Sequence, residues 1–262
     1  MSEINSPMAP PAGAAHDESA MTTPQTLTNI FFEPGRTFEA LRERPRFLVA
    51  ALITLAVFMT FYLAYIQRVG YENIINAEIE SRAQSTEMSE EQKAVGRDIQ
   101  TKPFVKAIRY GAPVIGIALV LAAGAGIYLL GSMLMGKGIS YKQALAVWTY
   151  SSLPPLVLLM IANLVLLLVR TPTEDSEIAR GLNGLVHANP SILFDAAANP
   201  VLATALGALD LFAIYGLFLA ALGMQKVARL SSGSAWAVVL GLWLLGVIGR
   251  IIIAAATGTP MA

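Results

Sequence analysis

The sequence predicts an all-α, polytopic membrane protein with five transmembrane helices. Hydrophobic residues make up 55% of the 262 residues and charged residues 14%, with a mean hydropathy of +0.58, which is far more apolar than a typical soluble domain. A bilayer core about 30 Å thick requires about 20 residues of helix. Five runs of at least this length carry no more than one charged residue each. The predicted spans are residues 47–66, 110–136, 143–169, 201–225 and 234–256.

The segment before the first span divides into two parts. Residues 1–26 are rich in Pro, Ala, Ser and Thr and have no apolar period, so they are predicted to be disordered. Residues 27–46 alternate aromatic and Leu side chains with charged ones, which predicts an interfacial amphipathic helix with its apolar side towards lipid and its arginines towards headgroups. Pro34-Gly35 interrupts this helix, and Pro45 marks the turn into the membrane.

The connection between the first two spans is long enough to contain secondary structure of its own. Residues 71–82 place isoleucines on one face, and Ser89, followed by two glutamates, is typical of an N-cap. Two short helices are therefore expected, the second running to about Ile108 with an interruption at Pro103. They form either a partner surface or a solvated hairpin that tethers two spans. Residues 257–262 form a short C-terminal tail.

The distribution of basic residues predicts the orientation. Four arginines precede the first span, and two short links that contain no acid carry two basic residues each. These three regions alternate with the other connections, so they lie on one side, and short basic links favour the cytoplasm. The N-terminus is predicted to be cytoplasmic and the C-terminus exterior. The residues expected to contact anionic lipid headgroups on that side are Arg36, Arg42, Arg44, Arg46, Lys137, Lys142, Lys226 and Arg229.

Two features inside the predicted spans concern packing. Small residues recur four apart, as in Ala122 and Gly126, a spacing that permits close helix contact and serves either bundle packing or a dimerisation motif. Pro154 and Pro155 remove two backbone donors in the middle of the third span, which predicts a helix kink. Such a kink is either a structural bend or part of a transport site.

The last two spans each contain one charged residue. Asp210 and Arg250 both lie twenty residues from Leu230, near the middle of the connection between these spans, so antiparallel helices would bring them to one depth. Three interpretations remain open: a buried structural ion pair, a proton or ion pathway, or a fourth span that begins at Leu211 and leaves Asp210 at the outer interface with Arg250 beside it.

Signatures of enzymes, metals and cofactors are missing from the sequence. HExxH, GxSxG, GxGxxG and phosphate-loop motifs are absent, and so is Cys. His16 and His187 are too isolated to form a metal cluster or a catalytic triad. The 18 basic and 18 acidic residues balance, so no overall field attracts nucleic acid. The chain is predicted not to be an enzyme and to bind no cofactor or metal.

Two segments resemble the Yip-domain family, in its bacterial members. They are FFEPGRTFEALRERPRF (31–47) and ALDLFAIYGLFLAALGMQKVARLSSGSAWAVVLGLWLL (208–245), separated by the five-span pattern. The resemblance implies a cytoplasmic N-terminus, five helices and a short exterior C-terminus. Eukaryotic relatives bind prenylated small GTPases and act in vesicle trafficking and membrane shaping. This chain differs from them in its short N-terminal tail and its exterior connections.

The sequence thus predicts a non-enzymatic protein of the bacterial inner membrane. Its expected role is that of a membrane organiser, adaptor or trafficking-like scaffold, which contacts anionic headgroups and recruits protein partners on the cytoplasmic face. The alternative is a transporter or channel subunit built around Pro154, Pro155, Asn163, Asp210 and Arg250.

Overall fold

The protein is a bundle of long helices with shorter helices at both ends. The computed structural model describes residues 21–86, 88–194, 196 and 198–261, and all secondary structure within them is helical, which confirms the predicted fold class. Four helices are long and apolar enough to cross a membrane, and a bent pair of shorter helices can provide a fifth crossing. The four are α3 (Leu48–Val69), α6 (Pro103–Leu134), α7 (Tyr141–Val169) and α11 (Ser232–Thr257), and the pair is α9 (Pro200–Gly207) with α10 (Leu211–Val227).

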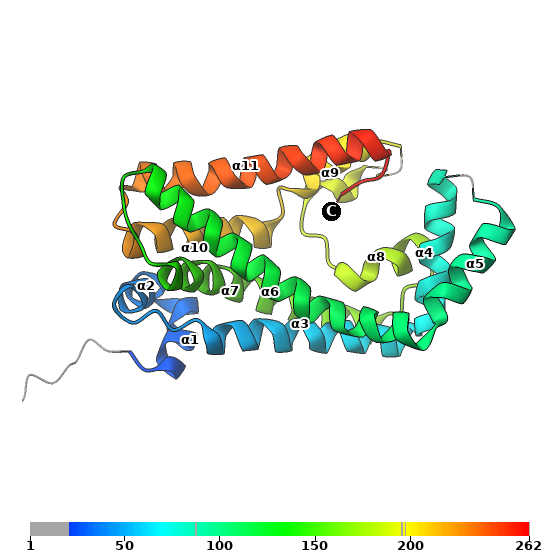
Figure 1. Ribbon diagram of the computed structural model, residues 1–262, viewed down its shortest axis with the longest axis horizontal. Coiled ribbons are helices and arrows are strands. Elements are labelled where there is room, and N and C mark those ends of the chain that lie inside the picture. Colours follow the sequence, from blue (N-terminus) through cyan, green and yellow to red (C-terminus); the bar gives the residue numbers. More distant parts are fainter. Residues whose placement is uncertain (1–20, 87, 195, 197, 262) are drawn as a thin grey trace, which may run out of the picture.

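The shorter helices gather at the two ends of the bundle (Figure 1). One end carries α1 (Thr23–Phe32) and α2 (Pro34–Glu43). The other end carries α4 (Tyr71–Thr86), α5 (Glu90–Thr101) and α8 (Asp175–Arg180). Two 3₁₀ turns, η1 (Gly181–Asn183) and η2 (Pro190–Leu193), lie in the connection between α7 and α9.

The N-terminal prediction needs a correction. Residues 1–20 of the predicted disordered tail lie outside the described residues, but residues 23–26 are the first turn of α1. Thr22 and Gln25 form a capping box that satisfies backbone donors at the start of the helix, and Pro24 stands in the first turn, where its missing N–H costs nothing. The composition of the tail concealed this helix start.

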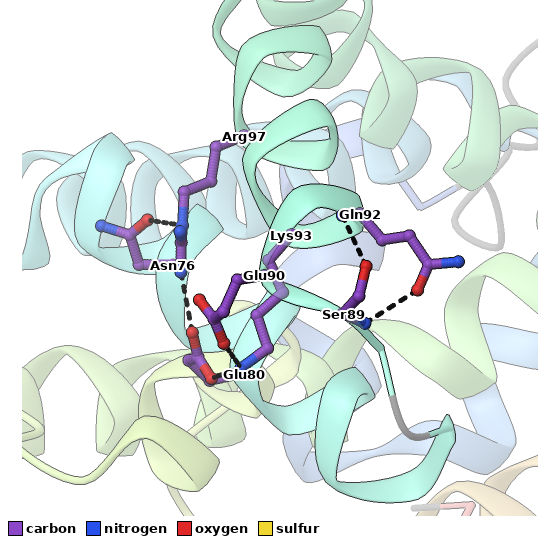
Figure 2. A network of polar contacts seen from close by, with 7 residues as sticks. All are labelled: Asn76, Glu80, Ser89, Glu90, Gln92, Lys93 and Arg97. Atoms are coloured by element: carbon purple, nitrogen blue, oxygen red, sulfur yellow. Dashed lines mark hydrogen bonds and ion pairs between the residues drawn. The ribbon is translucent and has the colours of Figure 1, made fainter.

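The predicted helical hairpin between α3 and α6 is present. Ser89 caps α5, and Gln92 completes the capping box. Glu80 of α4 lies between Lys93 and Arg97 of α5, with Nζ–Oε2 and Nη2–Oε1 distances of 2.9 and 2.7 Å (Figure 2). These ion pairs hold the two helices together. The second helix ends at Thr101, and α6 starts at Pro103, seven residues before the predicted span.

The helix α7 lies at the centre of the bundle and packs against α3, α6 and α10. It continues through Pro154 and Pro155 as one helix. The backbone of α10 approaches this region closely, because a Cβ on Gly216 would lie 3.5 Å from Pro155 Cγ. Asn163, about two turns after Pro155 in α7, is fully buried. Its side-chain oxygen accepts hydrogen bonds from the backbone N–H groups of Leu185 and Val186.

The predicted fourth span is broken, because α9 and α10 meet at 46°. Asp210 is the N-cap of α10, and its Oδ1 accepts hydrogen bonds from Phe212 N and Ala213 N at 2.9 and 3.3 Å. Its Oδ2 accepts from Ala188 N at 3.2 Å, and Asn189 Nδ2 lies 3.4 Å away. A carboxylate in this position satisfies donors at a helix start that hydrocarbon could not satisfy.

Arg250 is not a partner of this carboxylate. Within the described part of the chain, Asp210 and Arg250 form no ion pair. The prediction that Asp210 and Arg250 lie at one depth requires two straight helices of equal rise. The bend before Asp210 means that this requirement is not met. The helix α10 begins at Leu211, as the third interpretation expects, but no contact among the described residues joins Arg250 to Asp210.

Close helix packing occurs at glycines other than those in most of the predicted small-residue pairs. A Cβ on Gly124 would lie 2.1 Å from the Trp148 ring, and one on Gly131 would lie 2.4 Å from Val238. Gly126, from the predicted pair with Ala122, has open space instead. The same holds for three further glycines that follow a small residue by four positions, namely Gly136, Gly207 and Gly241.

The two glycines Gly124 and Gly126 of α6 give a matched test of this packing. Gly124→Ala should destabilise the protein by about 1–3 kcal/mol, because its methyl group would overlap the indole ring of Trp148. Gly126→Ala should leave stability unchanged or raise it by up to about 1 kcal/mol, because alanine favours helix. Thermal unfolding in detergent measures both, and equal effects would contradict the packing.

The role of Asp210 can be tested with a double-mutant cycle. Asp210→Ala should destabilise the protein by about 0.5–2 kcal/mol through the lost N-cap, and Arg250→Ala should have a smaller effect. Because the two residues share no contact, their effects should add in the double variant. Unfolding of the wild type and the three variants in detergent measures this additivity. Strongly non-additive effects would support an ion pair between Asp210 and Arg250.

Candidate functional site

Three segments meet at the end of the bundle that carries α1 and α2. They are the end of α2, the link between α6 and α7, and the link between α10 and α11. Seven of the eight basic residues predicted to contact headgroups lie in or beside these segments, and Arg36 lies in the first turn of α2. We call this end the basic face. It lies at the left in Figure 1, opposite the hairpin of α4 and α5.

The helices α1 and α2 pack against the bundle. Ile30, Phe38 and Leu41 are fully buried in a core cluster shared with α7 and α10. A Cβ on Gly223 of α10 would lie 3.0 Å from the Phe38 ring. The expectation that these apolar side chains face lipid is therefore wrong for the buried ones. Phe32 differs from them, with 80% of its surface exposed.

Polar contacts fix α2 in this place. Arg42 Nη1 donates to the Lys226 carbonyl at 3.4 Å, and Gln143 Nε2 donates to the Arg42 carbonyl at 2.7 Å. Lys226 Nζ lies 2.6 Å from Glu39 Oε1. The hydrogen bond from Lys226 lowers the pKa of Glu39 against the opposing effect of partial burial, so this carboxylate stays ionised at neutral pH. Residues of α2, α7 and α10 are thus joined in one network.

A pocket of about 410 Å³ opens on the basic face. Arg42, Lys137 and Arg229 line it, together with the carboxylate of Glu43. Its remaining lining residues are Gly138, Ile139, Gln143, Val227 and Ala228. The structure therefore gathers three of the eight predicted basic residues around a single concavity.

The other five predicted basic residues lie outside the pocket. Arg36 pairs with Glu33, its Nη1 lying 2.8 Å from Oε2. Arg46 Nη1 contacts Thr23 Oγ1 at 3.4 Å, which ties the start of α3 to α1. Lys142 is exposed in the first turn of α7. Arg44 lies directly after α2, and Lys226 forms the ion pair with Glu39.

Sequence reasoning missed two members of this site. The spacing Ser140-x-x-Gln143 is that of a capping box, which the structure shows at the start of α7, so the local sequence contains a signal for Gln143. In the sequence, Glu39 is one of several charged residues of an amphipathic helix. Its pairing with Lys226 depends on a separation of 187 residues, which local pattern cannot show.

The residues proposed for transport lie elsewhere. Pro154, Pro155 and Asn163 are buried between helices, and none of them lines the pocket on the basic face. Among the described residues no group of three or more His, Asp or Glu side chains could hold a metal ion.

A comparison with protein families finds a match over most of the chain. The Yip1 domain model matches residues 28–253, a range that starts within α1, ends within α11 and covers most of the chain. No curated protein and no solved structure gave a significant match. The match includes the basic face, the broken fourth crossing and the central α7. The chain is a multi-pass membrane protein that belongs to the Yip1-domain family.

Proposed function

We propose that this protein is a non-enzymatic membrane organiser and adaptor, whose basic face lies at the cytoplasmic surface of a bacterial inner membrane. The observation that carries the proposal is the docking of α1 and α2 onto the bundle. Burial of Ile30, Phe38 and Leu41 turns a potentially mobile amphipathic segment into a fixed surface. A fixed surface binds partners without the cost of ordering a flexible segment.

Charge supports the cytoplasmic placement of this surface. The links after α6 and α10, together with the helix turns that flank them, carry Lys137, Lys142, Lys226 and Arg229 and no acid, and short basic links favour the cytoplasmic side. Anionic lipids of that leaflet attract basic side chains, each contributing about 1 kcal/mol near the surface. The exposed Phe32 and Arg36 then face the cytoplasm beside the headgroups, where a protein partner can reach them.

The orientation can be tested with single cysteines, because the chain has none of its own. Exposed positions are available on α1, α5 and the end of α11 at Thr28, Ala94 and Thr257. In intact cells a membrane-impermeant maleimide should label Ala94→Cys and Thr257→Cys, whereas Thr28→Cys should react only after permeabilisation. Labelling of Thr28→Cys and Thr257→Cys from the same side would overturn the orientation.

The adaptor role can be tested with a photo-crosslinking amino acid at Phe32, followed by mass spectrometry in native membranes. Phe104, with 75% of its surface exposed near the opposite end, is the matched control position. Crosslinks to specific proteins are expected at position 32 and not at 104. Capture of only lipid and further copies of this chain at position 32 would reject the role.

A charge exchange shows whether the docked position of α2 matters for these crosslinks. Glu39→Lys should weaken them, because it places two lysines where Glu39 and Lys226 now pair. The double variant Glu39→Lys, Lys226→Glu restores opposite charges and should recover them. Crosslinks that persist equally in all three proteins would show that the fixed surface is not required.

A further inference from the structure

We propose that the pocket of Arg42, Lys137 and Arg229 binds a phosphomonoester group. The inference deepens the proposed function and rests on it, because it names the ligand chemistry of the same basic face. Four independent features of the pocket support it: its charge, its unpaired cations, its backbone geometry and its size.

The charge of the lining matches a dianion. Three cations and the single carboxylate of Glu43 leave two positive charges in excess. A phosphomonoester carries about −1.5 to −2 at neutral pH, whereas the phosphodiester of an ordinary lipid headgroup or a carboxylate carries only −1. Glu43 is a weak competitor for the cations. Its side chain is 64% exposed, and its Oε1 lies 3.9 Å from Arg42 Nη2.

Two of the three cations have no side-chain partner among the residues that the structure describes. Among the described residues, the side chains of Lys137 and Arg229 form neither an ion pair nor a hydrogen bond, so a ligand need not displace an internal contact. Arg42 is positioned by its contact with the Lys226 carbonyl. The backbone N–H groups of Gly138 and Ile139 also have no acceptor in the described part of the chain, and phosphate oxygens accept from such groups.

The backbone of Arg229 is strained in a way that fits a binding role. Its φ of 52° makes it the one non-glycine residue with a left-handed backbone among those described. This position follows the end of α10, where glycine is the usual residue because it adopts the conformation without cost. Strain of this kind at a non-glycine residue occurs preferentially at functional sites. Here the arginine places a cation in the wall of the pocket, which a glycine could not do.

The size of the pocket, and its position where the spans leave the membrane, fit a lipid headgroup or a small soluble phosphate. Its volume of about 410 Å³ lies within the usual range for small-molecule sites. Its lining comes from the ends of α2 and α10 and from the link before α7, at the level where spans leave the membrane. A phosphomonoester lipid such as phosphatidic acid and a water-soluble phosphate can both reach this level. They share the chemistry that the pocket recognises.

The test uses the full chain in phosphatidylcholine nanodiscs, with phosphatidic acid or phosphatidylglycerol added, and native mass spectrometry to count bound lipid. The wild type should bind phosphatidic acid at least about tenfold more tightly than the diester phosphatidylglycerol, because charge-assisted bonds are individually strong. Equal affinity for the two lipids, with no binding of soluble phosphate, would overturn the inference.

Inorganic phosphate and glycerol 3-phosphate, added to nanodiscs of phosphatidylcholine alone, distinguish the source of the group. Binding of these compounds in the micromolar range, with displacement of phosphatidic acid, would assign the pocket to a soluble phosphate. Selective binding of phosphatidic acid without competition would assign it to a membrane lipid. Failure of every phosphomonoester to bind would reject the site.

Two variants separate the pocket from the general charge of the basic face. Arg229→Gly should lower phosphomonoester affinity by about tenfold or more while thermal stability stays equal or rises, because glycine relieves the strained backbone. Lys142→Gln removes an exposed cation of the same face outside the pocket and should change affinity less than about twofold. Equal losses in both variants would show a diffuse field instead of a site.

The outcomes also separate this inference from the adaptor role. Arg229→Gly should leave the protein crosslinks at Phe32 in place, because it does not alter the packing of α1 and α2. Crosslinks without phosphomonoester binding would reject the pocket alone. Phosphomonoester binding without crosslinked partners would reject the adaptor role and leave the pocket standing.

Discussion

The inability of hydrocarbon to hydrogen-bond with the backbone is the constraint on which this structure depends. Within the long helices each N–H group finds an acceptor one turn away. The difficulty arises at helix starts and in the connections between helices, and here two polar side chains accept hydrogen bonds from such N–H groups. Asn163 accepts from the N–H groups of Leu185 and Val186, and Asp210 accepts from that of Ala188 as well as from two in α10. One stretch of the connection between α7 and α9 is therefore attached to two spans.

The sequence predicted those features of the fold that depend on composition and on the length of apolar runs. The long apolar runs identified α3, α6, α7 and α11 and the all-helical class, because a bilayer needs helices of that length. The cap at Ser89 was also predictable, because a helix cap depends on residues that are neighbours in the sequence. By contrast, an amphipathic pattern looks the same whether its apolar side meets lipid or protein, so the docking of Phe38 against Gly223 could not be foreseen. Helix bends are equally hidden, and the bend at Asp210 invalidated the alignment with Arg250.

The sequence predicted the basic residues of the candidate site, but it did not predict how they are arranged around the pocket. Positive charge in short links identified the basic face, because this pattern is visible in the local sequence. Which three cations share a pocket depends on how α2 lies against the links after α6 and α10, and the chain brings these together across more than 180 residues. The strained backbone at Arg229 follows from the tight connection of α10 with α11 and has no counterpart in hydropathy.

The docking of α1 and α2 has a consequence for biogenesis. These helices leave the ribosome before α10, yet their binding surface includes Gly223 of α10, which is made almost two hundred residues later. Until α10 is inserted, Phe38 and Leu41 have only part of their final surroundings. At translation rates of about 5–20 residues per second, this delay lasts on the order of ten seconds or more. The docked position of α1 and α2 therefore forms only after α10 has been synthesised. A nascent or truncated chain that lacks α10 cannot dock these two helices in this way.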